Sequence, residues 1–263
     1  MSMRTLAGNV VVVTGASAGI GAATARAFAH AGAHLVLAAR SPDPLARLAA
    51  SLPGTHLVVP TDVADPVACQ NLISQAVNGY GTVDLLINNA GVGLSGPVSS
   101  LDHDDLTRAL AVDLFGPLAL MQAVLPVMRA RGRGHIINVS TVLAVQPLPY
   151  LGGYAAAKAG LERLSDALRM ELQGSGINVS VVRPGTTRTG FSQNRLGKGG
   201  EQRRFSPPGV GPEVVARTIL RVARRPARVT YVTVGDRIGV IAAALFPGLI
   251  ERILGNAIGW KEA

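Results

Sequence analysis

The chain has 263 residues, 48% of them hydrophobic, which suits one large α/β domain with a full core or two small domains. Its one cysteine, Cys69, excludes a disulfide framework and its five histidines lack the spacing of metal ligands, so we expect a cytoplasmic protein without a metal site. The formal net charge of +9 would attract anionic partners such as nucleotides, acyl thioesters or phospholipid surfaces, and an arginine-biased coding composition explains it equally well.

Seven short apolar runs alternate along the chain with longer helical patterns. The runs cover residues 9–15, 34–40, 55–62, 83–91, 134–140, 177–185 and 229–235. Their continuous apolar character is typical of parallel strands that helices cover on both faces. They predict a Rossmann-type, doubly wound α/β fold, with about seven parallel strands, helices on both faces and ligands at the carboxyl ends of the strands. Because no linker or repeat divides the sequence, we expect a single domain, residues 1–263.

Helical patterns fill the gaps between these runs. The pattern after the first run ends at Gly32, a residue suited to follow a helix, and the pattern after the third run begins at Asp65 as N-cap. The long pattern at residues 102–132 should bend near Pro117 or Pro126.

A glycine cluster lies between the first strand and the first helix. Gly15, Gly19 and Gly21 allow a tight turn and let the backbone approach a pyrophosphate. The N-terminus of the following helix supplies N–H donors and a positive dipole. The sequence therefore predicts a dinucleotide site here, in preference to a tight turn without a ligand.

The second strand ends with Ala39 and Arg40, where an NAD site has an acidic residue that holds the ribose hydroxyls. No carboxylate there repels a 2′-phosphate, and a guanidinium can pair with one. This favours NADP(H) over NAD(H). Arg40 can also be interpreted as a solvated loop arginine, and Ala18 brings no second basic residue.

Tyr154 and Lys158 lie on the same face of a predicted helix, with β-carbons about 6 Å apart. A nearby ammonium stabilises the phenolate and lowers the pKa of a tyrosine, which is otherwise a poor acid or base at neutral pH. Tyr150 has no lysine four residues later and follows Pro149, so we place it on a loop that faces the substrate. Tyr154 is therefore the catalytic candidate.

Six motifs follow one another along the chain. They are Thr14-Gly15-x-x-x-Gly19-Ile20-Gly21, Asp62-Val63, Asn88-Asn89-Ala90-Gly91, Ser140-Thr141, Tyr154-x-x-x-Lys158 and Arg183-Pro184-Gly185. This ordered set closely resembles the short-chain dehydrogenase/reductase family over about residues 7–235. The resemblance implies a catalytic group of Asn, Ser, Tyr and Lys, of which Tyr154 and Lys158 match.

Two positions depart from the family's catalytic pattern. The serine is Thr141 here, whose hydroxyl can still bond to the substrate oxygen, while the neighbouring Ser140 would point the other way along a strand. The asparagine that helps hold a proton-relaying water is Asp113 here. Its carboxylate should pair with Lys158 and weaken the effect of the ammonium on Tyr154. We still expect an active enzyme, with a shifted pH dependence.

The resemblance also implies residues that bind the cofactor and the substrate. Asp62 would bond to the adenine, and Asn88 would support the sheet centre and contact the ribose. The implied cofactor-binding residues are Gly15, Ser17, Gly19, Ile20, Gly21, Arg40, Asp62, Val63, Asn89, Ala90, Gly91, Tyr154, Lys158, Pro184, Gly185, Thr187 and Thr189. The implied substrate-binding residues are Thr141, Tyr150 and Tyr154. Ordinary turn chemistry would explain several of these positions equally well.

Two segments near the C-terminus are candidates for contact with the substrate. Residues 186–214 are glycine- and arginine-rich and aperiodic, which predicts a mobile lid. Its basic residues would guide an anionic substrate or simply be solvated: Arg195, Lys198, Arg203 and Arg204. Residues 236–260 are unusually apolar and fit helical stripes broken at Pro247. This segment would wall the substrate pocket, pack on another subunit or lie on a membrane surface, in that order of preference.

The sequence thus predicts an NADP-dependent short-chain dehydrogenase/reductase that transfers a hydride between NADP(H) and a carbonyl or secondary alcohol, with a bulky apolar substrate. Two alternatives stay open: an NADPH-binding sensor or scaffold without turnover, which Asp113 motivates, and a membrane-associated lipid reductase. Family members are commonly oligomers, so we expect a homodimer or homotetramer. We expect neither nucleic-acid binding nor a membrane-spanning helix, because the sequence has no basic helix with interleaved aromatics and no run of about 20 apolar residues.

Overall fold

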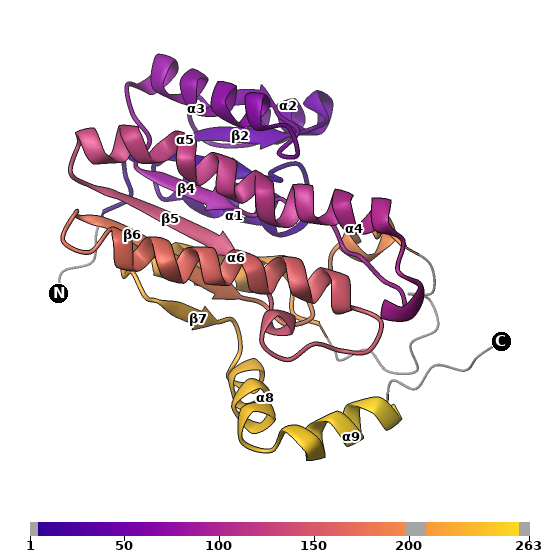
Figure 1. Ribbon diagram of the computed structural model, residues 1–263. Helices are drawn as coiled ribbons and strands as arrows, with labels where there is room; N and C mark the ends of the chain where they lie inside the picture. The colour runs from indigo at the N-terminus through magenta and orange to yellow at the C-terminus, as the bar shows by residue number, and fades with distance from the viewer. Residues whose placement is uncertain (1–4, 198–208, 258–263) are drawn as a thin grey trace.

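The seven apolar runs form seven parallel strands of one sheet in the computed structural model, which describes residues 5–197 and 209–257 (Figure 1). The strands are β1 Val10–Thr14, β2 His34–Ala39, β3 Leu57–Pro60, β4 Leu85–Asn88, β5 Gly134–Val139, β6 Ile177–Arg183 and β7 Val229–Tyr231. Their order in the sheet is β3-β2-β1-β4-β5-β6-β7. The Rossmann-type, doubly wound fold predicted from the sequence is therefore confirmed.

Helices connect the strands and lie on both faces of the sheet (Figure 1). The α-helices are α1 Gly19–His30, α2 Pro42–Ala50, α3 Pro66–Tyr80, α4 His103–Leu110, α5 Gly116–Ala130, α6 Gly152–Glu171, α7 Pro212–Arg224, α8 Val234–Leu245 and α9 Pro247–Ala257. Shorter helical turns are η1 Val98–Ser100, the π-helical turn η2 Ala111–Phe115, η3 Val142–Ala144 and η4 Gly190–Asn194.

The central strand of the sheet is β4, and the direction of winding changes between β1 and β4. Val12 of β1 pairs with Val36 of β2 on one side and with Leu86 of β4 on the other. From this pair of strands the chain winds outward, first to β3 and then to β7. The carboxyl ends of β1 and β4 therefore mark the topological switch point, where open α/β sheets bind their ligands.

Two hydrophobic layers hold the helices against the sheet. Side chains alternate along each strand, so that Val11 and Val13 face one layer while Val10 and Val12 face the other. The first layer includes buried residues of α1, α2 and α7, and the second includes buried residues of α3, α5 and α6. Burial on both faces explains why the strands are continuous apolar runs in the sequence.

Each strand ends one to four residues before its predicted run does, and three differences from the predicted elements have a clear physical reason or affect the site. The seventh strand ends at Tyr231 and not at residue 235, because Thr233 and Asp236 cap the start of α8 with reciprocal side-chain to backbone hydrogen bonds. Residues 212–214, predicted as part of the lid, form the first turn of α7. The long pattern at 102–132 is divided by the π-helical turn η2, which ends just before Pro117 and contains Asp113.

The stretch His103–Ala130, which comprises α4, η2 and α5, is long and apolar enough to cross a membrane by length and composition. The expectation that no segment has this character was therefore wrong. Leu120, Val124 and Met128 of this stretch are buried in the second hydrophobic layer, as in the core helix of a soluble domain. Of the apolar window, 33% is buried, so packing against the sheet accounts for part of its apolar composition.

Candidate active site

The glycine cluster makes a tight turn at the carboxyl end of β1. Gly15 and Gly19 have φ values of 63° and 53°, in the left-handed region that favours glycine. A β-carbon on Gly21 would collide with the carbonyl oxygen of Gly15 and lie 2.7 Å from Asn89 Nδ2. Ala18 makes no side-chain cap at the start of α1, and the first turn of α1 holds no acidic residue. The turn therefore leaves backbone N–H groups exposed to an anion, and its geometry fits a dinucleotide diphosphate.

Asn89 and Thr14 fasten this turn to the loop that follows β4. Asn89 Nδ2 donates to the carbonyl oxygen of Thr14 at 2.9 Å, and Thr14 Oγ1 accepts the N–H groups of Asn89 and Ala90, both at 3.0 Å. A β-carbon on Gly15 would lie 2.9 Å from the Cα of Ala90, so the two loops are in direct contact. Asn89, Ala90 and Gly91 thus lie at the switch point, beside the glycine turn.

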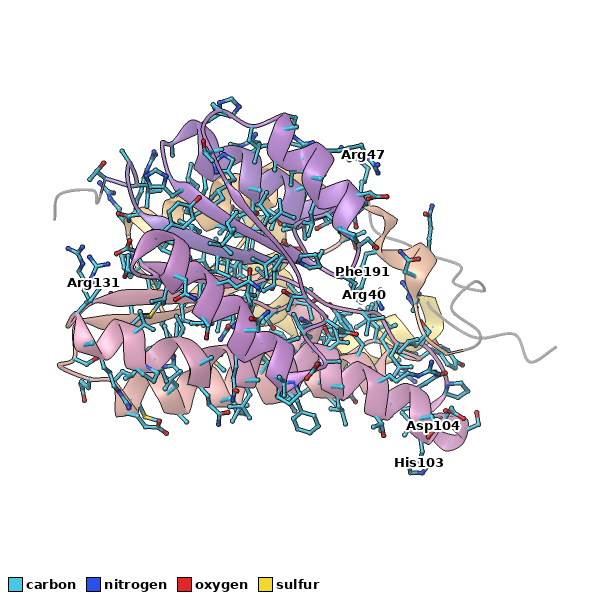
Figure 2. The ribbon with its side chains drawn as sticks, turned by 90° about the horizontal axis from the view of Figure 1, so that it is seen from above. Arg40, Arg47, His103, Asp104, Arg131 and Phe191 are labelled. Atoms are coloured by element: carbon cyan, nitrogen blue, oxygen red, sulfur yellow. The ribbon has the colours of Figure 1, made fainter. Side chains whose placement is uncertain are left out.

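Arg40 is exposed just beyond the end of β2, on the carboxyl side of the sheet (Figure 2). Within residues 5–197 and 209–257 its guanidinium makes no ion pair. Arg26 and Arg47 line a cavity of about 330 Å³ between α1 and α2, together with Ser17 of the glycine turn. Several guanidinium groups therefore lie around the region beyond the glycine turn.

Asp62 and Val63 follow β3 at the same end of the sheet. Asp62 is exposed and its carboxylate accepts the N–H of Ala64 at 3.0 Å, which is the turn chemistry anticipated as an alternative. Val63 is buried, and a β-carbon on Gly116 would collide with its carbonyl oxygen. Asn88 is also buried and donates from Nδ2 to Asn138 Oδ1 at 2.8 Å, so it joins β4 to β5 at the sheet centre.

Lys158 and Asp113 form a buried ion pair at the carboxyl edge of the sheet. Lys158 Nζ lies 3.1 Å from Asp113 Oδ1 and donates to the carbonyl oxygen of Val139 at 3.3 Å, at the end of β5. Asp113 has no exposed surface, and its carboxylate also accepts the N–H of Val92 at 3.3 Å. Burial raises the pKa of Asp113, and the charge of Lys158 opposes this rise. The structure shows the pairing that the sequence predicts, while its effect on activity stays a prediction.

Tyr154 projects from the first turns of α6 beside the segment that follows β6. Its ring packs against Phe191, with ring centroids 5.8 Å apart and planes inclined by 56°. Burial raises the pKa of Tyr154 above its usual range, the carboxylate of Asp113 adds to this rise, and the guanidinium of Arg195 opposes it. In this conformation the phenol is held protonated.

Thr141 and Ser140 point in different directions at the end of β5. Ser140 is buried, and its Oγ donates to Glu162 Oε1 of α6 at 2.7 Å. Thr141 is 7% exposed, and its hydroxyl oxygen accepts the N–H of Leu143 at 3.3 Å at the start of η3. The alternation that the sequence predicts for these two residues is thus present, and Thr141 keeps a hydroxyl proton that it can donate.

The segment after β6 crosses over the site and is pinned at several points. A β-carbon on Gly19 would lie 3.1 Å from Thr189 Cγ2, so Thr189 touches the glycine turn. Leu196 accepts the N–H of Ser95 at 3.0 Å and donates its own N–H to Gly93 at 2.8 Å. Residues 190–197 are therefore fastened to the loop after β4. Of the basic residues predicted for the lid, Arg195 is half-buried near Tyr154, whereas Lys198, Arg203 and Arg204 lie outside the described residues.

The other predicted residues lie on loops at the same edge. Tyr150 has a left-handed backbone conformation, with φ of 64°, between η3 and α6. Pro184 accepts the N–H of Val142, and Thr187 forms an isolated bridge with Val210. A β-carbon on Gly185 would collide with the carboxylate of Asp236, so the start of α8 lies against this loop.

Two features of the site were not predicted. Phe191 covers Tyr154, and its only signal in the sequence is an aromatic residue within a glycine- and arginine-rich segment. Glu162 is 2% exposed and pairs with Arg183 through a hydrogen bond of 2.8 Å from Nε to Oε1, while Arg183 also donates to Tyr231 at 2.7 Å. This network lies behind Ser140 and ties α6, β6 and β7 together.

A family model described as short chain dehydrogenase matches residues 9–198. The chain is 34% identical over 261 residues to Dehydrogenase/reductase SDR family member 7B of Bos taurus, covering 94% of this chain and 80% of the bovine protein. It is 35% identical over 194 residues to Ketoacyl reductase HetN of Nostoc, covering 72% of this chain and 68% of that protein.

Solved structures agree with these sequence relationships. A short chain dehydrogenase/reductase from Burkholderia phymatum in complex with NAD superposes with a TM-score of 0.85 and 25% identity, over 94% of this chain and 96% of that one. A metagenomic short-chain oxidoreductase in complex with NADP has a TM-score of 0.74 and 30% identity, over 88% of this chain and 98% of that one.

Proposed function

Because the chain belongs to the short-chain dehydrogenase/reductase family, we propose that it is an NADP-dependent oxidoreductase that acts on the carbonyl group or secondary alcohol of a bulky apolar compound. The observation that carries the proposal is the group formed by Tyr154, Lys158 and Asp113, beside a glycine turn shaped for a dinucleotide. The family supports an oxidoreductase; the choice of NADP and of the substrate is our proposal.

Charge supports NADP over NAD. Arg40 is exposed just beyond the end of β2 and makes no ion pair within the described part of the chain, at a place where an acidic residue would repel a 2′-phosphate. Arg26 and Arg47 lie around the cavity that includes Ser17, which adds positive potential on the same side. The similar solved structures include complexes with NAD and with NADP, so they do not decide between the two.

The residues that would hold the cofactor lie along the carboxyl edge of the sheet. The glycine turn would bind the diphosphate through backbone N–H groups, Lys158 would bind the nicotinamide ribose, and Pro184, Gly185, Thr187 and Thr189 would line the nicotinamide side. When bound, NADPH supplies a hydride to the carbonyl carbon.

Side chains of the protein would transfer the proton to and from the substrate oxygen. Tyr154 would donate its phenolic proton to the carbonyl oxygen during reduction and take it back from the alcohol during oxidation. Thr141 would donate a hydrogen bond to the same oxygen. Phe191 and the pinned segment around it would keep water from the phenol.

A second function, an NADPH-binding sensor or scaffold without turnover, is favoured by one observation. Asp113 pairs with Lys158 at 3.1 Å, and its charge adds to the rise in the pKa of Tyr154 that burial causes, which would weaken the acid–base pair that turnover needs.

The test measures NADPH binding and NADPH oxidation separately, with a panel of bulky apolar ketones. We expect turnover, lost in Tyr154→Phe while NADPH binding is kept; Tyr80→Phe, which removes a distant hydroxyl bonded to Thr55, serves as the matched control. Binding without turnover on any ketone would favour the sensor. Arg40→Ala should weaken NADPH binding with little effect on NADH, and equal losses for both cofactors would contradict the proposed preference.

Assembly and location complete the proposal. We propose a homodimer or homotetramer in the cytoplasm, which light scattering of the purified chain and cell fractionation would measure.

A further inference from the structure

Helix α6 carries a third ionisable side chain, Glu162, which the proposed reaction does not use. Glu162 follows Tyr154 and Lys158 at intervals of four residues, so the three side chains leave the same side of the helix. Glu162 is 2% exposed, and α6 packs against β6, whose last residue is Arg183 (Figure 1). Because a buried charge is costly unless it is paired, the contacts of Glu162 show which parts of the chain it holds.

Glu162 binds two segments of the chain at once. Its Oε1 accepts the hydroxyl of Ser140 at 2.7 Å, just after β5, and the Nε–H of Arg183 at 2.8 Å, at the end of β6. Its Oε2 accepts a second N–H from the same guanidinium. One carboxylate therefore joins the ends of two neighbouring strands on the carboxyl side of the sheet.

The backbone closes these contacts into a ring. The N–H of Val142 donates to the carbonyl oxygen of Pro184 at 3.0 Å, which joins the loop after β5 to the loop after β6. Val142 stands two residues after Ser140, and Pro184 directly follows Arg183. We call this closed series the contact ring; in order, its members are Glu162, Ser140, Thr141, Val142, Pro184 and Arg183.

The contact ring fixes the backbone on both sides of Thr141. Glu162 holds the residue before it, and Pro184 holds the residue after it. Thr141 itself has an extended backbone, and its hydroxyl oxygen accepts the N–H of Leu143. The remaining hydroxyl proton is the one proposed for the substrate oxygen, so the orientation of this side chain decides how well that bond forms. A displacement of about 1 Å in such a group can cost roughly a hundredfold in rate.

Stability alone gives a weak reason for a buried ion pair at this place. The side chains of Glu162 and Arg183 are 3% and 11% exposed, so both charges have lost most of their hydration. Well-packed apolar side chains of similar volume often stabilise a fold as well as such a pair does. A carboxylate offers what they lack, which is two oxygens that accept directional hydrogen bonds from both strand ends. The contacts therefore favour a role in positioning.

We propose that Glu162 is a positioning residue, which holds the hydroxyl of Thr141 in the orientation that the substrate oxygen requires. In this role Glu162 does not touch the substrate and acts through Ser140 and Arg183. The role rests on the proposed function, since it concerns the hydrogen bond from Thr141 to the substrate; the contact ring does not depend on that function.

A double-variant cycle tests whether Glu162 acts through Thr141. Thr141→Ala should lower kcat for ketone reduction by about a hundredfold, which is typical for the loss of one such donor. Glu162→Gln should lower kcat by about tenfold or more in the unmodified chain, but by less than about threefold in the Thr141→Ala background, because the hydroxyl that it positions is already absent. Glu171→Gln makes the same change at an exposed position of α6 and should leave kcat unchanged in both backgrounds.

Two further measurements separate positioning from folding and from turnover. Ser140→Ala opens the contact ring but leaves the pair of Glu162 and Arg183 intact, so it should show the same kinetic pattern even if Glu162→Gln fails to fold. Hydrogen exchange needs no substrate. The backbone amides of residues 140–143 should exchange at least about tenfold faster in both variants than in the unmodified chain, while the amides of α3 should not change.

Three results would overturn the proposal. They are an unchanged kcat in the folded variants, losses that multiply fully in the double variant, and unchanged exchange of residues 140–143. Circular dichroism and NADPH binding show whether each variant is folded. If the unmodified chain reduced no ketone, that result would count against the proposed function, and hydrogen exchange would still decide whether Glu162 holds this segment.

Discussion

Replacing Asp113 with asparagine tests how the buried carboxylate controls the proton of Tyr154. Asparagine keeps the size and an oxygen that accepts the N–H of Val92, but it removes the charge 3.1 Å from the ammonium of Lys158. Burial and the negative charge of Asp113 both hold the pKa of Tyr154 above its usual range. Removing the charge leaves the ammonium free to stabilise the phenolate, so the pKa of Tyr154 should fall.

The size of this fall follows from Coulomb's law. The charge of Asp113 acts on the pKa of Tyr154, and for the estimate we take a separation of roughly 7 Å between the carboxylate and the phenolic oxygen. At an effective dielectric constant of about 20, two unit charges at that separation interact by about 2.4 kcal/mol, or roughly 1.7 pKa units. We therefore expect a downward shift of about one to two pH units.

The assay is the pH dependence of kcat for alcohol oxidation with NADP⁺. Oxidation needs the phenolate as base, so its rising limb should move to lower pH in Asp113→Asn; reduction needs the phenol as acid, so its falling limb should move in the same direction. Asp102→Asn removes the same charge from the exposed N-cap of α4, and should leave both limbs unchanged. A rising limb that stays in place or moves to higher pH in Asp113→Asn would refute the reasoning.

Three further predictions concern the rest of the domain. Burial raises the pKa of the Cys69 thiol to about 11, so a maleimide should label it only after the protein unfolds, and labelling of the native chain at pH 8 would contradict this. Gly21→Ala forces a β-carbon against the Gly15 carbonyl and should destabilise the fold by about 1–3 kcal/mol and weaken NADPH binding, whereas Gly79→Ala in α3 meets only an ordinary contact and should leave stability equal or slightly higher, as urea unfolding would show. Glu162→Ala leaves Arg183 without its buried partner and should cost about 3 kcal/mol in urea unfolding, while Arg108→Ala, which breaks an exposed pair, should cost less than about 1 kcal/mol.

The strands were predictable because parallel strands that are buried on both faces consist of continuous apolar runs. Helix α2 was not recognised, since Pro42 and Pro44 in its first turn suggest a loop although both fit the start of a helix. Helix α7 was hidden by the glycine-rich segment before it, even though Val215, Ile219 and Val222 follow a helical period. The short seventh strand could have been predicted too, because Thr233 and Asp236 have the spacing of a capping box.

The site was predictable only where residues close in sequence act together. The spacing of Tyr154 and Lys158, and the glycine turn after β1, follow from local geometry. The contact of Phe191 with Tyr154 joins segments that only the folded chain brings together, and no periodicity records it. The link from Glu162 to Arg183 likewise joins α6 to the end of β6. Such contacts depend on the conformation of the loops at the sheet edge, and a single sequence does not show which distant segments these loops bring together.

Three influences set the pKa of Tyr154, and the segment that covers the site contributes to two of them. Burial is the largest cause of the raised pKa, the charge of Asp113 comes next, and Arg195 acts in the opposite direction. Phe191 contributes to the burial, and Arg195 comes from the same pinned segment, so one segment supplies both an influence that raises the pKa and one that lowers it. A displacement of residues 190–197 that exposed the phenol would lower its pKa through solvation but would also remove the guanidinium. The charge on Asp113 would remain in either position, because Asp113 is held by Lys158 and Val92, outside that segment.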